Sequence, residues 1–201
     1  MKAALRLLTV FSCYLLGPGA AGAIDLKFIP SSGSVALGNS IDVAIAVSGL
    51  GVNSAPSLGA FSFDVAFADS LVKYKNTTFG GQLALNGVTP VLRSATDNKT
   101  SVFLEESSNN TITELNALQA AEFTLAVLTF QAIALGNSPL NFENVTLGDA
   151  NGDPLTANLF NGSIGIIPNP SALIPEPSLV PAVLVLAGIG VLVEYKRRAH
   201  R

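Results

Sequence analysis

Residues 41–48 read Ile-Asp-Val-Ala-Ile-Ala-Val-Ser, and this stretch decides the fold class. Ile41, Val43, Ile45 and Val47 occupy alternate positions. Side chains along a β-strand point alternately to its two faces, whereas a helix places apolar residues three or four positions apart. The period of two therefore predicts a strand with one buried face.

The same alternation recurs on both sides of this stretch, at residues 24–28 and 61–68. The longer run 123–133 is apolar on both faces, which suits a central strand and leaves room for a bulge. Shorter strands are predicted at 140–142, 145–147 and 163–167. Many short strands with regular turns between them predict an all-β sandwich.

Turns are indicated wherever glycine, asparagine and serine gather between these runs. The turn signals are Ser31-Ser32-Gly33, Leu37-Gly38-Asn39, Gly80-Gly81, Asn86-Gly87, Gly136-Asn137, Asn151-Gly152 and Asn161-Gly162. One short helix is also predicted, because Thr111 and Glu114 have the spacing of a capping box. Ile112, Leu115 and Leu118 would share one face of that helix.

Residues 1–23 have the three parts of a secretory signal peptide. Lys2 and Arg6 precede the apolar run 7–16, and Ala21 and Ala23 are the two small residues of a small-x-small cleavage site. Two alternatives are a buried N-terminal helix and a lipoprotein signal that uses Cys13, whose upstream Phe11 fits a lipoprotein signal poorly. The signal peptide predicts that the rest of the chain is exported through the inner membrane.

A second apolar run, 179–193, stands near the C-terminus. Together with residues 177–178 it reaches the lower limit of about 17 residues for a single transmembrane helix. The tail 194–201 is basic, with Lys196, Arg197, Arg198 and Arg201. Positive charges stay in the cytoplasm, so Lys196, Arg197 and Arg198 would stop transfer and leave residues 24 to about 177 on the far side.

The segment 168–178 is a proline-rich linker that includes Pro175-Glu176-Pro177. This motif, followed by a short apolar span and a basic end, resembles the PEP-CTERM sorting signal of Gram-negative bacteria. The resemblance implies recognition by an exosortase, a membrane-embedded cysteine transpeptidase, and removal of the tail. The protein would then be anchored transiently and end at the cell surface or outside the cell. A permanently anchored surface protein is the alternative.

The body resembles a cohesin-type module in its strand order and spacing. The segments that carry this resemblance are 41–45, 60–65, 123–130 and 161–164. The resemblance implies a jelly-roll β-sandwich over residues 24–167 that binds another protein, which in cellulosomes is a dockerin. No single residue carries over as a dockerin contact.

The residue inventory disfavours several other classes of function. The chain holds one histidine, His200, and one cysteine, Cys13, both in the terminal segments. Serine–histidine and cysteine–histidine catalysis and most zinc sites need such residues in the body. Residues 24–174 contain twelve acids and five bases, a net charge of −7 that disfavours nucleic acid.

A hydrolase would have to rely on carboxylates such as Glu105 and Glu106. Adjacent residues on a strand point to opposite faces, whereas a glycosidase needs two carboxyl groups in one cleft. We therefore expect a non-enzymatic protein without a cofactor. A carbohydrate-binding module for exopolysaccharide is the alternative, although the chain has no tryptophan and the body has only Tyr74 as a tyrosine.

One calcium candidate is left. Asp149, Asn151 and Asp153 have the spacing that opens a calcium loop, but Pro154 and Phe160 stand where that loop requires glycine and glutamate. The Asn151-Gly152 pair between Leu147 and Leu155 is better interpreted as a hairpin turn.

Overall fold

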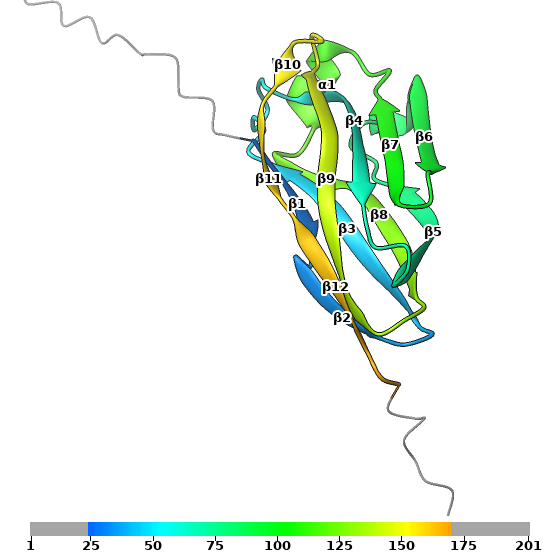
Figure 1. Ribbon diagram of the computed structural model, residues 1–201. Coiled ribbons are helices and arrows are strands. Elements are labelled where there is room, and N and C mark those ends of the chain that lie inside the picture. The colour runs from blue at the N-terminus through cyan, green and yellow to red at the C-terminus, as the bar shows by residue number, and fades with distance from the viewer. Residues whose placement is uncertain (1–23, 170–201) are drawn as a thin grey trace, which may run out of the picture.

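The computed structural model of this protein describes residues 24–169 (Figure 1). Several sequence predictions lie outside these residues: the signal peptide with Ala21 and Ala23, the motif Pro175-Glu176-Pro177, the span 179–193, and the basic residues Lys196, Arg197 and Arg198. Within residues 24–169, no helix is both long and apolar enough to cross a membrane.

The chain folds into two β-sheets that face each other (Figure 1). The five-stranded sheet has the order β11–β1–β3–β8–β5, with bounds β11 (Ala157–Phe160), β1 (Ile24–Ile29), β3 (Ser40–Ser48), β8 (Glu122–Ala132) and β5 (Val72–Phe79). The seven-stranded sheet has the order β2–β12–β9–β4–β7–β6, with β10 paired to β9. Its bounds are β2 (Ser32–Ala36), β12 (Gly162–Ile167), β9 (Gly136–Asp149), β4 (Leu58–Ala66), β7 (Ser101–Ser107), β6 (Leu92–Asp97) and β10 (Pro154–Leu155).

The apolar side chains at the alternating positions are buried and form the core between the sheets. Ile24, Leu26 and Phe28 of β1 are buried, and Phe28 stacks on Phe142 of the opposite sheet with ring centroids 4.2 Å apart. Phe63 of β4 meets the same Phe142 ring edge-on. The all-β sandwich predicted from the sequence is confirmed.

The long apolar run is β8, which lies between β3 and β5 and is bulged. Ile45 of β3 pairs with Ala126, but the next residue, Ala46, pairs with Thr124, so Leu125 is the extra residue. Both Leu125 and Ala126 are buried. A bulge turns two consecutive side chains toward the core, which explains why the sequence is apolar at adjacent positions.

Two details of the sequence prediction are wrong. Residues 140–142 and 145–147 belong to one strand, β9. Asn144 between them adopts φ 52°, and the register between β9 and β4 shifts at this point, but the pairing of the two strands continues on both sides. Gly136-Asn137 begins β9 and is not a turn, and of Ser31-Ser32-Gly33 only Ser31 lies in the turn, because β2 begins at Ser32. Each glycine is instead paired across a sheet, Gly136 with Ile166 and Gly33 with Ile164.

The predicted helix is α1 (Ile112–Leu118), and both halves of its capping box form between Thr111 and Glu114. Only Leu115 of its three apolar residues is buried. Gln119, at the end of the helix, accepts from the Leu58 amide and donates to the Leu58 carbonyl at 2.6 and 2.9 Å. The helix is therefore fixed to β4 mainly by a buried polar side chain. The Asn86-Gly87 turn forms within the 3₁₀ turn η1 (Leu85–Gly87).

Candidate binding surfaces

The outer face of the seven-stranded sheet presents two rows of residues across β6, β7, β4 and β9. The first row is Ser94, Glu105, Ser62 and Thr146, and the second is Thr96, Phe103, Asp64 and Glu143. The rows hold three acids and no base. We call this surface the acidic face.

A shallow hollow of about 300 Å³ lies at one end of the acidic face. Ser62, Leu92, Glu105 and Thr146 contribute to its lining, together with the hairpin that follows β9. The Leu92 side chain is 45% exposed, although it is apolar. An exposed leucine beside carboxylates offers both an apolar contact and negative charge to a partner.

The acidic face is held in position by its own polar contacts and by a close backbone approach. Asn144 Nδ2, at the irregular position of β9, donates to Asp64 Oδ2 at 2.8 Å. Gly59 sits where β4 skips a pair with β9, and a Cβ there would lie 2.3 Å from the Asp149 carbonyl oxygen. Glycine is thus required for the hairpin to close against β4.

The calcium candidate is this hairpin. Asp149 Oδ1 accepts from the backbone amides of Asn151 and Asp153 at 2.8 and 2.9 Å, and β10 pairs back onto β9. The hairpin interpretation of Asn151-Gly152 is confirmed. Partial burial alone would raise the pKa of Asp149, but these hydrogen bonds outweigh it and lower the pKa. In residues 24–169 no three His, Cys, Asp or Glu side chains gather closely enough to hold a metal ion.

Glu105 and Glu106 point to opposite faces of β7, as predicted. Glu105 lies on the acidic face, whereas Glu106 is only 1% exposed and faces the interior. The two carboxyl groups therefore do not share a cleft, and the pair lacks the arrangement that glycoside hydrolysis requires.

Arg93 of β6 is the partner of the buried Glu106, a contact that the sequence did not predict. Its guanidinium donates to Glu106 Oε1 through Nε at 3.0 Å and through a second nitrogen, and also to the Gly80 carbonyl oxygen. The guanidinium lies over the ring of Phe79, 5.3 Å from its centroid. Arg93 thus connects β6, the edge strand of one sheet, to the end of β5, the edge strand of the other.

The second oxygen of this carboxylate, Oε2, is buried and has no hydrogen-bond partner. Burial raises the pKa of Glu106, and the hydrogen bond and charge of Arg93 offset that rise only in part. The pair is therefore a costly feature of the fold beneath the acidic face.

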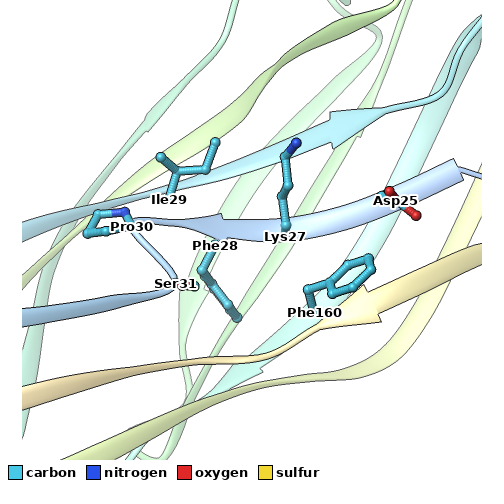
Figure 2. Close-up of a pocket in the computed structure, with 7 residues that line it drawn as sticks. All are labelled: Asp25, Lys27, Phe28, Ile29, Pro30, Ser31 and Phe160. Atoms are coloured by element: carbon cyan, nitrogen blue, oxygen red, sulfur yellow. The ribbon is translucent and has the colours of Figure 1, made fainter.

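A second hollow, of about 330 Å³, lies at the β1–β11 edge of the other sheet (Figure 2). Figure 2 shows Phe160 of β11 beside Asp25 and Lys27 of β1, with Pro30 and Ser31 in the turn that follows. Phe160 is 49% exposed. Asn158 donates to Asp25 at 2.9 Å, and Lys27 pairs with Glu122 at 2.8 Å.

Tyr74, the one tyrosine of the body, is directed to the core. Its ring meets Phe130 edge-on, and its hydroxyl shares a hydrogen bond with Thr77. Among residues 24–169, Phe160 is the one aromatic side chain that is largely exposed.

Solved structures of cohesin modules match this fold. The sixth cohesin of scaffoldin B from Acetivibrio cellulolyticus, solved with a Cel5 dockerin mutant, is 17% identical, with a TM-score of 0.59 over 72% of this chain and 99% of the cohesin. A non-cellulosomal cohesin from Archaeoglobus fulgidus is 12% identical, with a TM-score of 0.57 over 75% of this chain and 95% of that one. The cohesin module of a family 33 glycoside hydrolase from Clostridium perfringens is 11% identical, with a TM-score of 0.54 over 74% and 98%.

These matches cover nearly the whole length of each cohesin and show that the body has a cohesin-like fold. No protein-family model matches the chain, and no curated protein matches it in sequence.

Proposed function

We propose that this chain is an exported, non-enzymatic protein-binding module that an exosortase sorts and processes through its C-terminal motif. The observation that carries the binding part is the likeness to cohesins over almost their whole length, because several of them were solved in complexes with dockerins. A shared fold alone does not determine function, so the binding surface has to be argued from this chain's own residues.

The acidic face is the proposed binding surface. It is backed by strands bonded on both sides, with β4 between β7 and β9, so it is a rigid platform. Its two rows carry Asp64, Glu105 and Glu143, and Leu92 adds an exposed apolar side chain in the hollow. Complementary charge steers association and fixes orientation. The partner is therefore a protein with a basic surface that surrounds an apolar anchor.

Reversing one charge on the acidic face tests this surface. With residues 24–169 as bait and proteins collected outside the producing cells as prey, we expect Glu105→Lys to weaken capture of the partner by about tenfold or more, because like charges at an interface are costly. Glu122→Lys makes the same charge change on the outer face of the other sheet and should leave capture unchanged. Equal capture by both variants would count against the acidic face.

A second candidate function, carbohydrate binding, is favoured by the hollow in Figure 2. Exposed Phe160 beside Asp25 and Lys27 combines an aromatic face with polar groups. Binding of exopolysaccharide that Phe160→Ala abolishes and Glu105→Lys leaves intact would favour this function over protein binding.

The export part of the proposal rests on the two ends of the sequence. The signal peptide 1–23 and the basic tail both keep their charges in the cytoplasm, which leaves the sandwich on the far side of the inner membrane. In this proposal the span 179–193 holds the protein in the membrane until the exosortase acts at Pro175-Glu176-Pro177. The released sandwich then works at the cell surface or in the extracellular matrix.

The motif is tested by Glu176→Ala in cells that contain an exosortase. We expect the variant to accumulate in the membrane fraction with its tail, at the expense of the released form, because the extended Pro-Glu-Pro element is the proposed recognition signal. Immunoblots of membrane and medium measure the shift, and Glu194→Ala, beyond the span, is the matched control. Release of Glu176→Ala at the normal level would indicate a different signal or none.

A further inference from the structure

Three exposed apolar side chains mark the end of the sandwich where the chain leaves toward its C-terminus (Figure 1). Ile133 and Leu135, in the loop between β8 and β9, are 42% and 52% exposed, and Ile167, the last residue of β12, is 49% exposed. We call this set the apolar end.

Backbone contacts hold the apolar end together. The amides of Ile133 and Ala134 both donate to the Leu71 carbonyl oxygen at 2.8 and 3.3 Å. Gly136, directly after Leu135, pairs with Ile166, and the Ile167 carbonyl oxygen accepts from Leu37. The three side chains are therefore presented by firmly bonded backbone.

The chain beyond the apolar end determines what lies next to it. Ile167 is followed by the eleven residues 168–178, four of which are proline, and then by the apolar run 179–193. A proline-rich segment of this length would extend about 34 Å as polyproline II, at 3.1 Å per residue. With the run inserted in the membrane, the bilayer surface thus lies within a short, stiff tether of Ile133, Leu135 and Ile167.

We propose that the apolar end rests on the bilayer surface while the tail is inserted, with these three side chains in contact with lipid. This inference rests on the proposed membrane tail. A single acyl chain gives only marginal, reversible membrane binding, so three side chains hold the domain only while it is tethered. Cleavage of the tail then releases it. Contact with lipid also sets the orientation of the sandwich, and it leaves the opposite end, which carries Val52, away from the membrane.

The test uses the full chain with Cys13→Ser, produced in a Gram-negative host without an exosortase and reconstituted into phosphatidylcholine vesicles. A single cysteine, Leu135→Cys, carries a fluorophore, and lipid-borne nitroxides quench labels that touch the bilayer. Val52→Cys is the control, because Val52 is 71% exposed and follows the far end of β3, about 30 Å away along a nine-residue strand.

We expect at least twofold stronger quenching at position 135 than at position 52, and loss of most of that difference when Ile133→Asp is added. Alkaline carbonate washing reports whether the tail is inserted. Protein that stays in the vesicles but shows equal quenching at both positions overturns the membrane contact alone. Protein that washes off overturns the membrane tail and the contact together.

Discussion

Phe63→Ala is expected to lower the free energy of unfolding by about 3–5 kcal/mol, as truncations of buried phenylalanine do. Phe63 lies on β4 with no exposed surface, between Ser62 and Asp64 of the acidic face. Its ring stacks near Phe61 with centroids 5.2 Å apart and meets Phe142 edge-on at 5.6 Å. Removing the ring leaves a cavity between the sheets directly beneath the proposed binding surface.

Urea unfolding of residues 24–169, followed by intrinsic fluorescence of Tyr74 or by circular dichroism, measures this loss. Phe160→Ala is the control, because that ring is half exposed and its removal should change stability by at most about 0.5 kcal/mol. Similar losses for the two variants would mean that the core is not centred on the aromatic cluster of β4 and β9.

Arg93→Leu is expected to destabilise the fold by roughly 3 kcal/mol at neutral pH, because it leaves the buried Glu106 carboxylate without its charge partner. Leucine keeps an apolar side chain at this position but removes the guanidinium that pairs with Glu106 and lies over the Phe79 ring. Glu106→Gln should cost much less, since Arg93 keeps enough exposure to be hydrated. Replacing both residues by leucine should recover most of the stability, as for other buried ion pairs replaced by apolar residues.

The loss in Arg93→Leu should depend on pH. Burial already raises the folded-state pKa of Glu106 above its unfolded value, and removing Arg93 raises this pKa further. A folded state with the higher pKa binds the proton more tightly, so its stability falls as pH rises from the unfolded pKa to the folded pKa. The loss of stability in Arg93→Leu is therefore expected to be small at acidic pH and to reach its full size at neutral pH. A defect that does not change with pH would assign the loss to packing instead.

The sequence predicts those strands that keep a strict period of two. β1 and β4 bury every second residue, and the bulged centre of β8 follows from apolar residues at adjacent positions. These strands were predictable because burial alone shaped their sequences.

Two of the strands that were missed, β6 and β7, carry charged residues on the inner face. In β7 the third inward position is Glu106, and in β6 the inward positions include Arg93 and Asp97. β5 skips a ladder position at Lys75, which shifts its alternation. The ion pair between Arg93 and Glu106 places a charged residue where each strand would otherwise have an apolar one. The alternation of apolar and polar residues is therefore lost in both β6 and β7, and the sequence pattern does not predict these strands.

The candidate site was predictable only in part. The opposite directions of Glu105 and Glu106 follow from their adjacency, and the hairpin at Asn151-Gly152 follows from the turn residues. The acidic face could not be predicted, because it depends on which strands lie side by side. Its acids Asp64, Glu105 and Glu143 come from β4, β7 and β9. Lateral order of strands is set by the packing of the whole sandwich and leaves no local signal.

Both the acidic face and the apolar end act as proposed only if the sandwich reaches the far side of the membrane, and release of the sandwich requires that the tail is removed there. The intact mass of the protein recovered outside the cells that produce it tests this directly. We predict a mass that lacks residues 1–23 and also lacks the span 179–193 with the basic tail. A mass that retains the span and tail, found in the membrane fraction with no released form, would contradict exosortase processing and indicate a permanently anchored sandwich.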